Sequence, residues 1–106
     1  MKHIMCKLIG GIKDNWIVEQ SFLKSAHENN LDVRGVLKEE FHEPEGITLI
    51  LLLGESHYSL HSYYEDDCYY VDLFTCNPDT PVKKIIKRLA ELTSSQIVDV
   101  VELERT

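Results

Sequence analysis

A short, almost unbroken apolar segment near the middle of the chain constrains the fold most strongly. It comprises residues 47–53 (Ile-Thr-Leu-Ile-Leu-Leu-Leu) and is bounded by Gly46 and Gly54. A helix that spans a membrane needs about 20 apolar residues, so this segment is far too short to cross a bilayer. An apolar run of this length between two glycines is typical of a buried strand.

Four other segments have the pattern of β-strands. Their residues are mostly apolar or alternate between apolar and polar, and turn-forming residues flank them. The predicted strands comprise residues 3–9, 31–41, 69–75 and 97–101.

Two segments have the spacing of amphipathic helices. The apolar side chains of residues 15–29 lie on one stripe, and Asp14 precedes them as a candidate N-cap. A second helix is expected after a turn, with Pro81 at its first position. The order strand, helix, three strands, helix, strand favours an α+β fold, a two-layer sandwich with two helices on one face of a mainly antiparallel sheet.

The length and charge of the chain limit its architecture and partners. A chain of 106 residues suits a single domain covering residues 1–106, and a deep small-molecule site then forms more easily between two copies. We therefore expect a homodimer or larger homo-oligomer. The formal net charge of -7 disfavours nucleic acid as a partner, because phosphate backbones are repelled.

The cysteines and the N-terminal residues indicate the compartment. Cys6, Cys68 and Cys76 form neither a C-x-x-C pair nor an even disulfide framework, and the sequence from Met1 shows no signal peptide. We expect a cytoplasmic protein without a membrane partner, and the sequence predicts no metal site.

Reactive side chains gather just after the apolar strand. Residues 54–61 read Gly-Glu-Ser-His-Tyr-Ser-Leu-His, and Glu65 and Cys76 follow. A serine next to a carbonyl that it can attack, a nearby base and a proton donor can together convert the serine into an electrophile. Glu-Ser-His alone is not specific, since a serine at a strand end is usually a turn residue.

The spacing of these residues resembles that of the prokaryotic S-adenosylmethionine decarboxylases, pyruvoyl-dependent enzymes of spermidine synthesis. The pattern is Glu-Ser-His-x-x-x-His-x-x-x-Glu at residues 55–65, followed by Val-Asp-Leu-Phe-Thr-Cys at residues 71–76. The resemblance implies decarboxylation of S-adenosylmethionine for polyamine synthesis, after self-cleavage of the Glu55–Ser56 bond. The cofactor would be a pyruvoyl group derived from Ser56, which condenses with the substrate amine, so no external cofactor is needed.

The resemblance also implies roles in self-cleavage. The hydroxyl of Ser56 would attack the carbonyl of Glu55, His61 matches the base, and Thr48 matches a position where a serine usually assists ester formation. Threonine can make the same hydrogen bonds. Because an odd number of positions separates Ser56 from His61, their use in one site requires a bend or bulge near Ser59.

Further residues match the family's proton donor and substrate site. Cys76 matches the proton donor, although an unpaired cysteine is more often a small buried hydrophobic residue. Glu65 matches the carboxylate that binds the ribose hydroxyls, and Phe41 or His42 matches the aromatic residue that stacks on adenine. A lone acid in this region is more often part of a solvated turn, and a phenylalanine at a strand end is usually in the core.

The chain departs from the family pattern at two places. Residues 62–64 are Ser-Tyr-Tyr instead of Thr-Trp-Pro, and Lys7 replaces a glutamate. Lys7 would repel a cationic substrate if it faced the site, and would have no effect if it faced solvent. The alternatives are a divergent homologue that acts without a pyruvoyl group as a lyase on S-adenosylmethionine or an adenylated derivative, a basic amino acid decarboxylase, and a catalytically silent binding or regulatory subunit.

Overall fold

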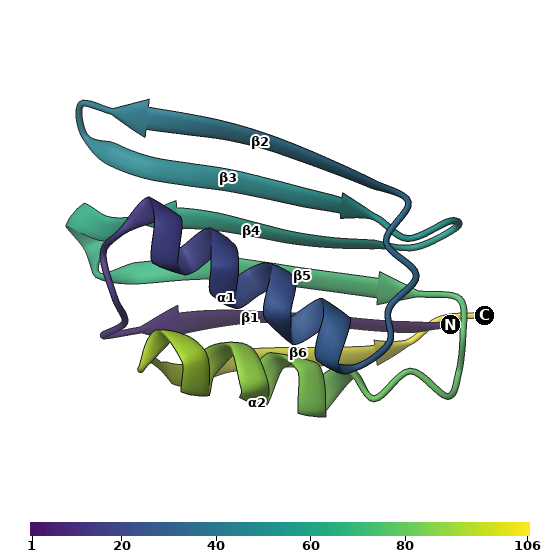
Figure 1. Cartoon of the computed structure of the whole chain (residues 1–106). Coiled ribbons are helices and arrows are strands. Elements are labelled where there is room, and N and C mark those ends of the chain that lie inside the picture. Colours follow the sequence, from purple (N-terminus) through teal and green to yellow (C-terminus); the bar gives the residue numbers. More distant parts are fainter.

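The computed structural model describes residues 1–106, which form six strands and two helices (Figure 1). In chain order, the elements are β1 (Lys2–Ile9), α1 (Asn15–Glu28), β2 (Gly35–His42), β3 (Glu45–Leu52), β4 (His57–Tyr63), a 3-10 turn (Tyr64–Asp66), β5 (Cys68–Thr75), α2 (Val82–Thr93) and β6 (Gln96–Glu104). Neither helix is long and apolar enough to span a membrane.

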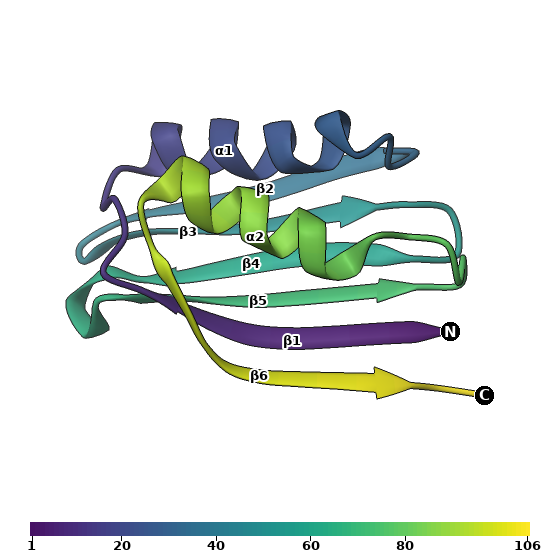
Figure 2. The same ribbon diagram turned by 90° about the horizontal axis from the view of Figure 1, so that it is seen from below.

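The six strands form one antiparallel sheet in the order β2-β3-β4-β5-β1-β6. Both helices lie on the same side of this sheet (Figure 2). The predicted α+β two-layer sandwich is therefore confirmed. We call the other side of the sheet, which no helix covers, the open face.

The core lies between the helices and the sheet, and alternation along the strands determines which side chains enter it. In β3, Ile47, Leu49 and Leu51 are fully buried under the helices, whereas Ile50 and Leu52 are exposed on the open face. The apolar segment that dominates the sequence is therefore a strand whose two faces have different environments.

The element boundaries differ from the predictions in physically simple ways. The structure contains β4 as an additional strand, which the predicted order omits because its residues are mostly polar; Tyr58 and Leu60 alone bury large apolar side chains there. β2 begins at Gly35, four residues later than predicted, because the N–H of Leu31 instead donates to the carbonyl of Ala26 at the end of α1.

The two helix starts also differ from each other. The carboxylate of Asp14 accepts a hydrogen bond from the N–H of Ile17, as expected for an N-cap. α2 begins at Val82, one residue after the predicted Pro81, and no side chain caps it. The hydroxyl of Thr80, which could have capped this helix, pairs with the hydroxyl of Thr75 at 2.9 Å.

Side chains on the open face form rows, because directly paired residues on adjacent antiparallel strands point to the same side. Three rows matter for function, and each runs from β3 through β4 and β5 to β1: Leu52, His57, Phe74 and His3; Ile50, Ser59, Asp72 and Met5; Thr48, His61, Tyr70 and Lys7.

Large apolar side chains are also exposed on the open face. They are Leu37, Phe41, Ile50, Leu52, Tyr63, Tyr70, Val101 and Leu103. No helix or loop of the chain covers these side chains.

Candidate active site

The Glu55–Ser56 bond lies in the tight turn that joins β3 to β4. Across this turn, the N–H of Leu53 donates to the carbonyl of Ser56 at 2.9 Å. Gly54 has a φ of 72°, in the left-handed region that glycine adopts without steric cost. Glu55 is exposed and Ser56 is half-buried, so the bond for which cleavage is predicted is accessible.

Cys76, immediately after β5, contacts both residues of this bond. Its backbone N–H donates to Oγ of Ser56 at 3.0 Å, and its thiol donates to the carbonyl oxygen of Glu55 with an Sγ–O distance of 3.4 Å. A donor on the carbonyl oxygen stabilises the charge that develops there during nucleophilic attack. The fold therefore brings three predicted catalytic residues together.

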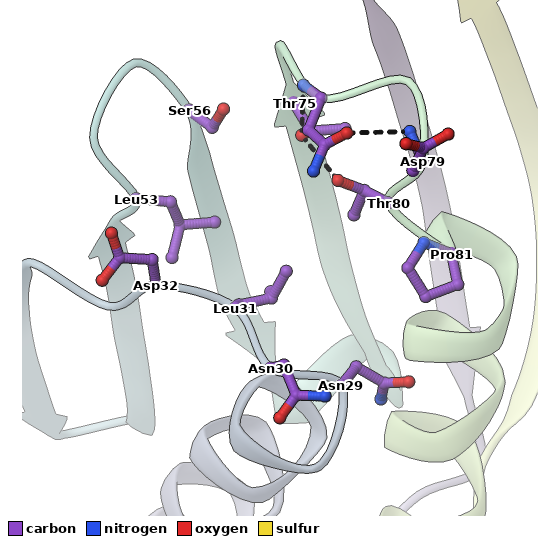
Figure 3. Close-up of a pocket in the computed structure, with 11 residues that line it drawn as sticks. Asn29, Asn30, Leu31, Asp32, Leu53, Ser56, Thr75, Asp79, Thr80 and Pro81 are labelled. Carbon is purple, nitrogen blue, oxygen red and sulfur yellow. Dashed lines mark hydrogen bonds between the residues drawn. The ribbon is translucent and has the colours of Figure 1, made fainter.

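A polar cavity of about 320 Å³, which we call the Ser56 cavity, lies between the helix ends and the sheet beside Ser56 (Figure 3). Its lining residues are Asn29, Asn30, Leu31, Asp32, Leu53, Ser56, Thr75, Asn77, Asp79, Thr80 and Pro81. Two carboxylates, those of Asp32 and Asp79, and no basic side chain line this cavity. It therefore favours neutral or cationic groups over anions.

Thr48 and His61 form a second pair of predicted catalytic residues. They are direct partners across β3 and β4, and Oγ1 of Thr48 lies 3.2 Å from Nδ1 of His61. Both side chains are half-buried on the open face. The hydrogen bond fixes the orientation of the imidazole ring and leaves its other nitrogen free for proton transfer.

A cavity of about 280 Å³ surrounds this pair, and we call it the His61 cavity. Its lining residues are Phe41, Glu43, Pro44, Glu45, Gly46, Thr48, His61, Ser62, Tyr63 and Glu65. Four of the predicted site residues thus share one cavity. His42 does not line it, because successive residues of a strand point to opposite faces.

The structure separates Ser56 from His61 within one chain. β4 pairs with β3 and β5 without a register shift from His57 to His61, so the bend or bulge expected near Ser59 is absent. At about 3.3 Å per residue, the five positions between Ser56 and His61 correspond to roughly 16 Å. One chain therefore carries two half-sites at different positions along β4.

Lys7 lies on the same face as His61. Lys7 in β1 pairs with Tyr70 in β5, and Tyr70 pairs in turn with His61 in β4. Nζ of Lys7 is 5.8 Å from the centroid of the Tyr70 ring. This distance permits a cation–π interaction that holds the ammonium near the ring. Lys7 lies on the open face two strands from His61, and it lines neither the Ser56 cavity nor the His61 cavity.

The other two thiols are unsuited to the predicted chemistry. Cys6 and Cys68 are buried, and burial raises the pKa of the Cys6 thiol to about 11. A thiol with such a pKa stays protonated and unreactive at neutral pH. Cys76 is the partly exposed cysteine, and it is also the one beside Ser56.

The sequence profile of the S-adenosylmethionine decarboxylase family matches residues 2–106. The chain belongs to this family. Among relatives, it is 29% identical to S-adenosylmethionine decarboxylase proenzyme 2 of Halalkalibacterium halodurans, over 98% of this chain and 84% of the relative. It is 32% identical to the S-adenosylmethionine decarboxylase proenzyme of Archaeoglobus fulgidus, over 85% of this chain and 83% of the relative.

The fold of this S-adenosylmethionine decarboxylase family member is similar to that in a crystal structure of the adenosylmethionine decarboxylase from Aquifex aeolicus. The TM-score is 0.85 at 23% sequence identity, and the match covers 98% of this chain and 88% of the other. At this identity, the comparison supports the fold.

The Tyr63-Tyr64 pair, which departs from the family pattern, has two different structural roles. Tyr63 lines the His61 cavity, so its ring contributes to the candidate substrate site. Tyr64 is buried, and its hydroxyl donates to Oδ1 of Asn15 at 2.7 Å. Burial raises the pKa of Tyr64 to about 12, which keeps this hydroxyl protonated as a donor. The pair thus ties the 3-10 turn to α1 and forms part of one cavity wall.

Sequence reasoning missed one part of the Ser56 environment and one nearby cluster. The backbone N–H of Cys76 reaches Ser56 only because β4 pairs with β5, and no sequence signal reports that contact. Pairing of β5 with β4 on one side and with β1 on the other brings Asp72 and His3 close to His57. Alternation along β1 and β5 could have assigned these side chains to one face, but their proximity depends on strand order.

Proposed function

We propose that the protein is a proenzyme that cleaves itself between Glu55 and Ser56 and then decarboxylates S-adenosylmethionine in polyamine synthesis. The observation that carries this proposal is the contact of Cys76 with both residues of the bond, at Oγ of Ser56 and at the carbonyl of Glu55. The relatives from H. halodurans and A. fulgidus, both called S-adenosylmethionine decarboxylase proenzymes, support the same reaction and processing.

Cleavage would begin when Oγ of Ser56 attacks the carbonyl carbon of Glu55. An ester replaces the peptide bond, the Ser56 nitrogen becomes an amine, and the Cys76 thiol stabilises the carbonyl oxygen during the attack. A base then removes the α-proton of Ser56 and the Glu55 carboxylate leaves, which separates residues 1–55 from residues 56–106. Hydrolysis at the new N-terminus releases ammonia and leaves a pyruvoyl group.

The surroundings of Ser56 fit such a group. The N–H of Cys76 lies within hydrogen-bond distance of position 56, and the Ser56 cavity of about 320 Å³ adjoins it. A pyruvoyl group supplies an electron-withdrawing carbonyl that accepts the electrons released when carbon dioxide leaves. Cys76 would hold the proton that the substrate carbon then needs, because its thiol already lies beside position 56.

We propose that a complete site forms between two copies that pack through their open faces. Ser56 and His61 are roughly 16 Å apart along β4, so His61 of the partner subunit would act as the base for Ser56. The exposed apolar side chains of the open face supply the hydrophobic area that such an interface requires. The His61 cavity, about 280 Å³, is slightly smaller than typical ligand pockets of roughly 300–1,000 Å³, and a second copy would enlarge and close it.

The adenosyl part of the substrate would bind in the His61 cavity. Phe41 is 49% exposed there and offers a ring face for adenine, and Glu65 offers a carboxylate to the two ribose hydroxyls. The methionine part would extend toward Ser56 of the partner subunit. In this arrangement, each substrate contacts both copies.

Product analysis tests the proposed reaction against the alternatives. The purified protein is incubated with S-adenosylmethionine, and we expect carbon dioxide and decarboxylated S-adenosylmethionine in equal amounts. Methylthioadenosine without carbon dioxide would indicate a lyase, and consumption of ornithine or arginine without binding of an adenosyl compound would indicate a basic amino acid decarboxylase. Binding without turnover of any of these compounds would indicate a regulatory subunit.

A further inference from the structure

Two histidines and one aspartate converge on the open face, on three adjacent strands. Nε2 of His3 in β1 lies 2.7 Å from Oδ1 of Asp72 in β5, and Nε2 of His57 in β4 lies 3.4 Å from the same oxygen. The potential ligand atoms of all three residues lie within 4.8 Å of one another. We call these residues the His3–His57–Asp72 cluster.

Phe74 holds the two imidazole rings in place. It is the direct cross-strand partner of both His57 and His3, and so lies between them. Its ring stacks on His57 with centroids 5.7 Å apart, and meets His3 edge-on with centroids 5.5 Å apart. The two rings are therefore oriented by packing as well as by their contacts with Asp72.

We propose that the His3–His57–Asp72 cluster binds a divalent transition metal ion such as Zn²⁺. Two imidazole nitrogens and one carboxylate oxygen form a donor set that suits zinc or iron, whereas Mg²⁺ and Ca²⁺ prefer oxygen ligands. Metal–ligand bonds of about 2.1 Å place neighbouring ligand atoms roughly 3.0–3.4 Å apart. The distances of 2.7 and 3.4 Å to Asp72 already approach this spacing without an ion.

Exposure and hydrogen bonding indicate a site whose ligand set a single chain leaves incomplete. The side chains of His57 and Asp72 are 45% and 37% exposed, so water or a second copy can supply the remaining ligands. Nδ1 of His3 is buried without a hydrogen-bond partner. When Nε2 binds the metal, the ring proton must occupy this nitrogen without an acceptor, which lowers the affinity.

This inference does not rest on the proposed reaction, because none of the three residues has a role in it. The test therefore uses Ser56→Ala, which cannot undergo the proposed cleavage and keeps the chain intact. Metal-free protein without an affinity tag is titrated with Zn²⁺ by calorimetry and with Co²⁺ by absorption spectroscopy. We expect one Zn²⁺ per chain, and no binding of Mg²⁺ under the same conditions.

Ligand variants assign the binding to the cluster. Asp72→Asn and His57→Gln should each weaken Zn²⁺ binding by about tenfold or more, whereas His27→Gln, on exposed α1 surface, should leave it unchanged. Circular dichroism checks that each variant is folded. Absence of saturable binding, unchanged affinity in both cluster variants, or a thiolate-to-cobalt charge-transfer band that indicates a cysteine ligand would each overturn the proposal.

Discussion

The backbone N–H of Cys76 donates to Oγ of Ser56 at 3.0 Å, although 20 positions separate the two residues in the chain. Pairing of His57 with Phe74 aligns the start of β4 with the end of β5 and creates this contact. Because the backbone makes the bond, the orientation of Ser56 does not depend on the side chain at position 76. Backbone and thiol can therefore serve different steps.

Replacement of the thiol separates these two steps. Cys76→Ala keeps the hydrogen bond from the backbone N–H to Ser56 but loses the hydrogen bond from the thiol to Glu55. Because one hydrogen bond contributes about 0.5–1.5 kcal/mol, we expect self-cleavage to slow by roughly tenfold at most. Turnover of the processed enzyme should fall further, by about 10²–10⁴-fold, because the proton donor is missing. Electrophoresis over time and release of carbon dioxide measure the two rates. Undiminished turnover would remove Cys76 from catalysis.

The Thr48–His61 pair should govern cleavage rather than folding. His61→Ala should accumulate the ester at Ser56, which hydroxylamine cleaves, since no base removes the α-proton. Thr48→Val should slow processing by removing the hydroxyl at 3.2 Å from Nδ1 of His61, whereas Thr48→Ser is the matched control that keeps it. Processing of His61→Ala at the wild-type rate would exclude this histidine as the base.

Mixed oligomers test whether the base comes from the other copy. Ser56→Ala lacks the nucleophile but keeps the base His61. His61→Ala lacks the base but keeps the nucleophile Ser56. When the two variants are co-expressed with different mass tags, the His61→Ala chain should be cleaved, and the Ser56→Ala chain should remain whole. If neither chain is cleaved in verified mixed oligomers, the site does not form between copies.

The charge at position 7 should affect ligand affinity. Lys7 lies in the same cross-strand row as His61, so Lys7→Glu should strengthen binding of the cationic S-adenosylmethionine severalfold, and Lys7→Gln should have an intermediate effect. Calorimetry on the Ser56→Ala background at two salt concentrations measures this, and the difference should shrink at high salt. Equal affinities in all three proteins would show that the ammonium does not act on the ligand.

Local sequence patterns predict most of the fold, because periodicity reports which side of an element is buried. Residues 47–53 and the Asp14 cap are examples, and both are close to their predicted positions. β4 lacks a strong strand signal because only two of its residues, Tyr58 and Leu60, bury large apolar side chains. Its existence becomes evident only from its pairing with both neighbours.

The sequence predicts which residues form the candidate site, but not how strands and copies of the chain bring them together. The odd separation of Ser56 and His61 predicts a bulge if both residues act within one chain. The regular pairing of β4 removes that expectation, and we propose instead that the two residues meet between two copies. Distances between strands and between copies depend on topology, which local patterns do not contain.

The mass of the purified chain under denaturing conditions tests the central claim most directly. We predict that the 12.3 kDa chain converts over time into two fragments, residues 1–55 and residues 56–106, the second beginning with a pyruvoyl group. Ser56→Ala should remain at full mass under the same conditions. A wild-type chain that also remains at full mass after prolonged incubation would contradict self-cleavage and the pyruvoyl mechanism.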